Sequence, residues 1–104
     1  MFCAVYKFEV KEGQSEKFIK GWEGLTKLIY QYEGSLGSRL HLEHRNNYIA
    51  YAQWPNKETW KNSGKKLPAE AFTFRELMKD SCVSITTSHE LDVVSDLLST
   101  VPLP

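Results

Sequence analysis

The segment Tyr48–Trp60 reads Tyr-Ile-Ala-Tyr-Ala-Gln-Trp-Pro-Asn-Lys-Glu-Thr-Trp, and the interpretation of the whole chain starts from it. Its first half is rich in aromatic and β-branched residues, as a strand requires. Pro55 cannot donate to a central strand ladder, so the strand is predicted to end at Trp54. Asn56 suits the N-cap of a short helix from Lys57 to about Ser63. The segment therefore predicts a strand that leads directly into a helix, with one tryptophan on each side of the junction.

The residues before this segment predict a strand, a helix and a second strand. Phe2 to Val10 alternates with the two-residue period of a half-buried strand. From Gln14 to about Tyr32, apolar residues recur every three or four positions, as in an amphipathic helix. Gly34 follows and suits a left-handed helix end. Gly37 to Arg45 is the second strand, and Asn46-Asn47 is predicted to form a tight turn into the aromatic strand.

The predicted turn fixes which residues of these two strands face each other. It places Arg39 opposite Trp54 and His41 opposite Ala52 on one side of the sheet, with Leu40 and Leu42 on the other. Because side chains alternate along a strand, a slip of one residue would invert this assignment. The sequence leaves open which of the two faces the helices cover.

The rest of the chain completes a recognisable order of elements. Pro68 suits the first position of another helix, whose inner side would be Ala71, Phe74, Leu77 and Met78. Val83 to about Val94 reads as a long last strand. The resulting order is strand, helix, strand, strand, helix pair, strand, which is the split βαβ sandwich of the α+β ferredoxin-like fold. We expect one domain over residues 1–104, with a core at about 2–95 and an extended tail at 96–104.

Composition limits the classes of partner. The chain has 104 residues, of which 41% are hydrophobic, which is enough for one domain with a modest core. Thirteen basic and thirteen acidic residues give a formal net charge of zero, so no long-range field attracts nucleic acid or an anionic membrane, and neither partner is expected. The amino terminus enters a strand without a signal-like apolar run, which predicts a cytoplasmic protein.

The two cysteines are predicted to be buried free thiols. Cys3 and Cys82 are too few and too far apart for a disulfide framework, and neither has the close partner of a metal or redox motif. In this topology the first and last strands are antiparallel neighbours, and each cysteine stands at the beginning of its strand. They are therefore expected at opposite ends of the sheet.

Several motifs together resemble the antibiotic biosynthesis monooxygenase family. They are Phe18 with Trp22 on the first helix, Gly34-Ser35 before the second strand, and Trp54-Pro55-Asn56 leading to Trp60. The resemblance covers about residues 2–95. It implies a dimeric α+β barrel, in which the sheets of two copies pack face to face and each subunit holds a pocket between sheet and helices. It also implies cofactor-free oxygenation of a small phenol or hydroquinone, which once deprotonated supplies the electrons to O₂.

The resemblance also implies candidate site residues. The substrate-binding wall is predicted from the aromatic residues Trp22, Trp54, Trp60, Phe72 and Phe74. The polar catalytic group is not identified, and Tyr6, His41 and Tyr51 are the candidates, depending on which sheet face the helices cover. The chain departs from quinone-forming members at two positions. Trp60 stands where a helix tyrosine is expected, and Ala50 where a strand asparagine is expected; an indole nitrogen can only donate a hydrogen bond.

Other functions are weighed against this one. Haem-degrading relatives use a histidine on the helix after the tryptophan, and this chain has no histidine between Trp60 and Cys82, which argues against haem. A zinc site is not expected, because His41 and His44 lie on opposite sides of their strand. A non-catalytic dimeric barrel that binds a small aromatic ligand or a partner remains open, because the sequence shows no clear acid–base pair.

Overall fold

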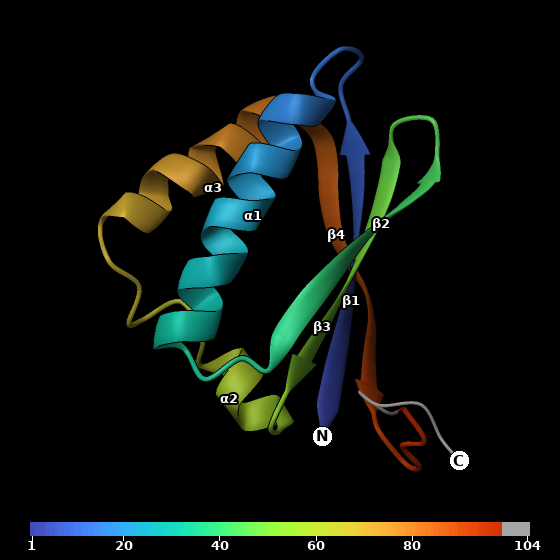
Figure 1. Cartoon of the computed structure of the whole chain (residues 1–104), viewed down its shortest axis with the longest axis vertical. Helices are drawn as coiled ribbons and strands as arrows, with labels where there is room; N and C mark the ends of the chain where they lie inside the picture. The colour runs from blue at the N-terminus through green and yellow to red at the C-terminus, as the bar shows by residue number, and fades with distance from the viewer. Residues whose placement is uncertain (99–104) are drawn as a thin grey trace.

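A four-stranded antiparallel sheet carries helices on one of its faces. The computed structural model describes residues 1–98. Its elements are β1 (Phe2–Val10), α1 (Ser15–Tyr32), β2 (Gly37–His44), β3 (Asn47–Trp54), α2 (Lys57–Lys61), α3 (Glu70–Ser81) and β4 (Cys82–Asp92). Figure 1 shows α1 and α3 side by side along the sheet, with α2 at the end where β3 stops. The strand order β2-β3-β1-β4 is that of the ferredoxin-like fold, so the predicted α+β fold class is confirmed.

The extended tail that the sequence predicts at residues 96–104 lies only partly within the described residues. Asp96 to Leu98 belongs to neither a helix nor a strand, and residues 99–104 lie outside the part of the chain that the structure describes. None of the helices in residues 1–98 combines the length and the apolar character that a membrane crossing needs.

The central strands β1 and β3 show which face of the sheet the helices cover. The buried alternate residues are Phe2, Ala4, Phe8 and Val10 on β1 and Tyr48, Ala50, Ala52 and Trp54 on β3. Phe18 of α1 packs between them, with its ring centroid 5.0 Å from that of Phe8 and 5.1 Å from that of Tyr48. Phe18 is fully buried, so it belongs to the hydrophobic core.

The β2–β3 hairpin differs from its prediction. Leu42, rather than Arg45, pairs with Tyr48, a register shift of three residues, and the loop is Arg45-Asn46, with Arg45 at a φ of 51°. Because the shift is an odd number, it inverts the predicted faces. His41 pairs with Ile49 on the open face of the sheet, whereas Leu40 packs against the core. Helix packing favours this register, because it places Leu40 rather than Arg39 or His41 against the core.

Helices α1 and α3 pack closely where α1 has glycines. A Cβ atom added at Gly24 would lie 2.3 Å from the ring of Phe74, so the phenylalanine occupies the space that a side chain would need. Ala71 and Met78 are buried on the same side of α3, as predicted. The predicted inner stripe of α1 does not extend to Tyr32, which is 43% exposed, because the last turn of α1 reaches beyond α3.

Polar contacts fix the helix ends near the strand-to-helix junction. The Asn56 side chain accepts a hydrogen bond from the Thr59 amide at 2.8 Å, which confirms the predicted N-cap. At the end of α1, the buried carboxylate of Glu33 accepts hydrogen bonds from the amides of Gly64 and Lys66. Glu33 thus ties α1 to the connection between α2 and α3.

Both cysteines are free and buried, as predicted. Cys3 pairs with Leu91, whereas Cys82 pairs with Val10, so the two thiols are separated by seven residue steps along β1, or about 23 Å at ~3.3 Å per residue. A disulfide requires Cα atoms within ~7 Å.

We expect mass spectrometry under non-reducing conditions to find two free thiols per chain. An intrachain bridge would contradict this strand pairing.

Candidate functional site

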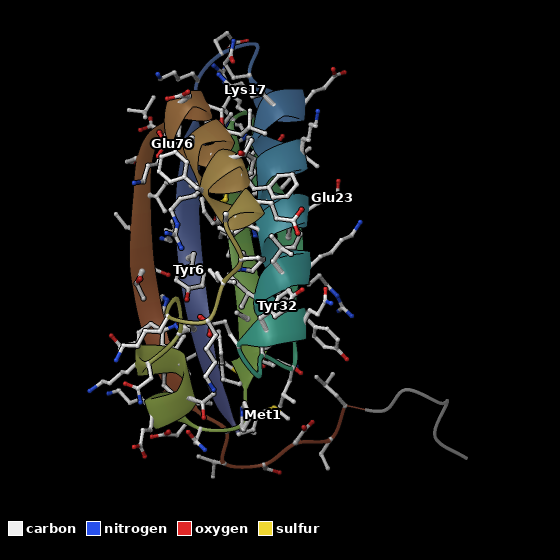
Figure 2. All side chains as sticks on the ribbon, turned by 90° about the vertical axis from the view of Figure 1, so that its left-hand side faces the viewer. Met1, Tyr6, Lys17, Glu23, Tyr32 and Glu76 are labelled. Carbon is white, nitrogen blue, oxygen red and sulfur yellow. The ribbon has the colours of Figure 1, made fainter. Side chains whose placement is uncertain are left out.

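A cavity of about 200 Å³ lies between the sheet and the helices. Its aromatic lining comes from Tyr6 and Phe8 of β1, Trp22 of α1 and Trp54 of β3. Its aliphatic hydroxyl groups come from Thr26, Ser35 and Ser38. Figure 2, which views the molecule from the helix side, shows Tyr6 on β1 at a level between α2 and α3.

Small side chains at the centre of the sheet explain why space remains there. Ala4 of β1 pairs with Ala52 of β3, and Ala50 follows on the same face, opposite Tyr6. All three alanines are buried, and Ala52 lines the cavity. Larger residues at these positions would fill the layer beneath α1, as Phe8 and Tyr48 do further along the sheet.

Tyr6 is held by a hydrogen bond from α2. The indole Nε1 of Trp60 donates to the Tyr6 hydroxyl at 2.6 Å, and the Trp60 ring packs on Phe2 with centroids 5.2 Å apart. Burial raises the pKa of Tyr6; the Trp60 hydrogen bond opposes this rise, and the nearby Glu90 charge adds to it. Tyr6 therefore stays a neutral phenol at physiological pH and can donate its own hydrogen.

Trp54 presents a second donor. Its indole Nε1 has no hydrogen-bond partner and is the one buried side-chain nitrogen or oxygen in this state within residues 1–98. The residue is 3% exposed, so water does not readily compensate for the missing partner. An unsatisfied buried donor costs about 1–3 kcal/mol, and an acceptor within hydrogen-bond reach of Nε1 would recover this energy.

No charged side chain lines the cavity in the part of the chain that the structure describes. Ser38 donates to the Tyr51 carbonyl at 3.0 Å, and the Ser35 hydroxyl accepts from the Gly37 amide at 3.0 Å, so both hydroxyls are already engaged. Glu90, the charge that acts on Tyr6, forms an ion pair with Lys57 at 3.3 Å. The cavity is therefore mostly apolar, and its remaining hydrogen-bonding side chains are Tyr6, Thr26 and Trp54.

The five aromatic residues predicted as the binding wall lie in different places. Trp22 and Trp54 line the cavity, and Trp60 reaches it through Tyr6. Phe72 is 65% exposed on the outer side of α3 and does not reach the cavity. Phe74 packs on α1 and borders a shallow groove outside the helices. The helical repeat of α3 places Phe72 on the outer side, whereas Phe74 packs against α1 and the core, and neither of them lines the cavity.

The three candidate polar groups lie on two different faces of the sheet. Tyr6 faces the helices and lines the cavity. His41 lies on the open face, with Nδ1 3.2 Å from the Ile49 carbonyl oxygen, because the hairpin register is inverted. Tyr51 also lies on the open face, where its hydroxyl accepts a hydrogen bond from the Cys3 thiol, and this contact raises the pKa of Tyr51. Of the three, only Tyr6 can take part in a site at the cavity.

Some residues that line the cavity were not predicted from the sequence. Ser38 was missed because the predicted hairpin register placed it on the face of the sheet opposite to Trp54, whereas it pairs with Ala52. Ala52 carries a usable signal, because it is a small residue two positions before Trp54 on the same face of β3. Residues 1–98 contain no group of three or more His, Cys, Asp or Glu side chains placed to hold a metal ion.

The chain matches the model of a known protein family. A family model described as antibiotic biosynthesis monooxygenase matches residues 1–72, which is more than half of the chain. Comparison with curated protein sequences gave no significant match.

Solved structures with the same fold extend over most of the chain. SnoaB, a cofactor-independent oxygenase from Streptomyces nogalater, aligns with a TM-score of 0.67 and 12% identity over 91% of this chain and 97% of its own. A protein from Caulobacter crescentus, provisionally named an antibiotic biosynthesis monooxygenase, gives 0.75 and 16% over 90% of both chains. A protein of the same provisional name from Nitrosomonas europaea gives 0.73 and 11% over 91% of this chain and 100% of its own. At these identities the likeness establishes the fold.

Proposed function

The chain belongs to the antibiotic biosynthesis monooxygenase family, and from this premise we propose that it is a cofactor-independent monooxygenase that oxidises a small phenol or hydroquinone with O₂. The observation that carries the proposal is an apolar cavity whose lining includes Trp54, with its unpartnered Nε1, and Tyr6, with a neutral hydroxyl. An aromatic wall that excludes water suits a phenolic ring, and the donors suit its oxygen.

The cavity volume favours a single-ring substrate. Drug-sized ligands occupy pockets of roughly 300–1,000 Å³, whereas a dry engineered cavity of about 150 Å³ takes up benzene. The 200 Å³ between the sheet and α1 is close to the second value. A substituted single ring fits this space, and a fused three-ring phenol would require the helices to move.

The reaction needs no electrons from the protein. In the conversion of a phenol into a quinone, one ring C–H becomes C=O. One oxygen atom of O₂ enters the substrate, and the other leaves as water together with the ring hydrogen and the phenolic proton. All electrons come from the substrate. The protein then has to hold the ring, exclude water and stabilise the oxygen on which negative charge develops.

An oxygen-electrode screen over hydroquinones, catechols, simple phenols and anthrone-like phenols tests the proposal. We expect consumption of one O₂ for each quinone formed, with single-ring substrates at least about tenfold faster than three-ring ones because of the cavity volume. Chelator-treated protein should keep this activity, and assays without protein correct for autoxidation. Tight binding of single-ring phenols without any oxygen consumption would favour the non-catalytic ligand-binding barrel instead.

A homodimer formed by sheet-to-sheet packing belongs to the same proposal. The open face of the sheet, which no helix within residues 1–98 covers, carries the half-exposed apolar side chains Val5, Ile49, Tyr51 and Leu91. Apolar residues on both faces of a single sheet call for a second layer, and another copy of the sheet supplies one with matching twist.

Sedimentation analysis at micromolar concentration should therefore find a dimer. Ile49→Asp would place an unpaired charge in the proposed interface and is expected to give monomers. Phe72→Asp is the matched control, because Phe72 is equally apolar but lies on the outer side of α3. A monomeric wild-type protein would contradict the dimer and leave the cavity proposal standing.

A further inference from the structure

We propose that residues 99–104 of this chain dock as an added strand on the outer edge of β2, with the side chains of Val101 and Leu103 in the groove between β2 and α1. The occupant of the groove is thus a segment of the same chain, which we call segment 99–104. The docking surface is the sheet edge, so the proposal does not depend on the chemistry assigned to the cavity.

The strand β2 stands at one edge of the sheet. In the order β2-β3-β1-β4 it pairs with β3, and no strand within residues 1–98 pairs with its other side. Alternate backbone N–H and C=O groups of an edge strand point away from the sheet, and such a row is a template for one more strand. The outer side of β2 between Arg39 and Glu43 can therefore accept a short extended segment.

A mostly apolar groove of about 480 Å³ follows β2 on the helix side. Its apolar walls include Ile19 and Trp22 of α1 and Leu40 and Leu42 of β2. Leu42 is 62% exposed, so an occupant that covers it removes apolar surface from water. The two leucines lie two positions apart on the same face of β2. A fitting occupant is therefore an extended segment that presents apolar side chains with the same spacing.

Segment 99–104, with the sequence Ser-Thr-Val-Pro-Leu-Pro, has this spacing. In an extended chain the side chains of Val101 and Leu103 share one face, and the backbone groups of these two residues point to the same edge. Those of Pro102 and Pro104 point to the opposite edge, where the missing N–H groups of proline cost nothing. Proline also restricts the undocked chain, which lowers the entropy lost on docking. The pattern therefore suits the outermost strand of a sheet.

The described part of the chain ends beside the beginning of β2. Leu98 lines a hollow of about 600 Å³ together with Leu36 and Gly37. Figure 2 shows the chain after β4 passing below the end of the sheet to reach this place. The three steps from Leu98 to Val101 cover about 10 Å at ~3.3 Å per residue. The three steps from Gly37 to Leu40 cover the same distance, so a strand parallel to β2 brings Val101 beside Leu40.

Docking of segment 99–104 has a consequence for the cavity. Trp22 and Ser38 line both the groove and the cavity, so a docked segment covers the cavity wall on its β2 side. We expect the full chain to bind nitrobenzene, a neutral single ring, about fourfold more tightly than a chain that ends at Leu98, the effect of one methylene group removed from water. Equal affinity of the two chains would overturn this consequence.

Amide hydrogen exchange tests the docking itself. The full chain is compared with the chain that ends at Leu98, which keeps every helix and strand of the described structure. A segment that is docked nine-tenths of the time slows exchange about tenfold, so the amides of β2 that point away from β3 should exchange at least about tenfold faster after truncation. The amides at the other sheet edge, on β4, should exchange at the same rate in both chains.

Two matched variants locate the contact. Leu103→Asp places a charge in the apolar groove and should reproduce the truncation, whereas Pro104→Asp places the same charge on the opposite side of the segment and should keep the protection of β2. Ile49→Asp, the variant expected to be monomeric, should also keep it, because the segment belongs to the same chain.

Equal exchange of the β2 amides in the full and the truncated chain would overturn the proposal. An equal loss of protection in Leu103→Asp and Pro104→Asp would also overturn it, because the side chain of Leu103 would then not occupy the groove. Protection that is present in the dimer but absent in monomeric Ile49→Asp would assign the groove to the segment of a second copy and refute docking within one chain.

Discussion

Trp60→Ala is expected to abolish binding or turnover of a phenol and to lower the free energy of unfolding by up to about 3 kcal/mol, the lower end for a fully buried large aromatic side chain, because Trp60 is partly buried. The reason is that Trp60 has two roles in the structure. Its ring packs on Phe2 at a centroid distance of 5.2 Å, and its Nε1 holds the Tyr6 hydroxyl at 2.6 Å. The alanine variant loses both contacts and opens the end of the cavity to water. Denaturant unfolding and the oxygen assay measure the two effects.

Trp60→Phe separates the two roles. A phenylalanine keeps most of the packing on Phe2 but cannot donate to Tyr6, so we expect most of the stability to return while turnover stays well below that of the wild type. If Trp60→Ala retained full activity, Tyr6 would not depend on Trp60, and the placement of the site at this end of the sheet would be wrong.

Ala52→Leu is expected to eliminate ligand binding with a smaller cost in stability. Ala52 of β3 lines the cavity on its sheet side, and a leucine there would occupy the space that we assign to the substrate ring. Filling an existing void is tolerated better than overpacking, which typically costs about 1–3 kcal/mol, so the variant should remain folded. Titration with nitrobenzene should then show no binding.

The matched control for Ala52→Leu is Ile49→Leu, a change to the same residue type on the same strand but on the open face. This control should bind nitrobenzene like the wild-type protein. Unchanged binding in Ala52→Leu would mean that the ligand occupies another part of the molecule. The groove beside Phe74 on the outer side of α1 would then be the next place to examine.

The order of elements was predictable because strong local signals mark it. The Trp54-Pro55-Asn56 junction ends a strand and caps a helix with residues that have few alternatives, and the structure places both events at these residues. The period of apolar residues in α1 and the alternation in β1 are likewise local properties of the chain. These signals, together with the family resemblance, were enough to predict the sheet order.

The composition of the site was less predictable, because it depends on contacts between distant segments. The hairpin register is set by an irregularity after Leu42 and by the left-handed Arg45, and an asparagine pair in the sequence pointed to a different turn. That error moved His41 toward the site and Ser38 away from it. The hydrogen bond between Trp60 and Tyr6 joins residues 54 positions apart, and no local pattern indicates it.

Glu33 has a consequence for the dynamics of the connection between α2 and α3. Its buried carboxylate holds the amides of Gly64 and Lys66, in the connection that follows the helix carrying Trp60. Release of this connection requires both charge-assisted hydrogen bonds to break and a carboxylate to be left without partners, so the segment opens as one cooperative unit rather than by gradual fraying. Exchange of the Gly64 and Lys66 amide hydrogens with solvent is then limited by how often these contacts with the carboxylate at the end of α1 break.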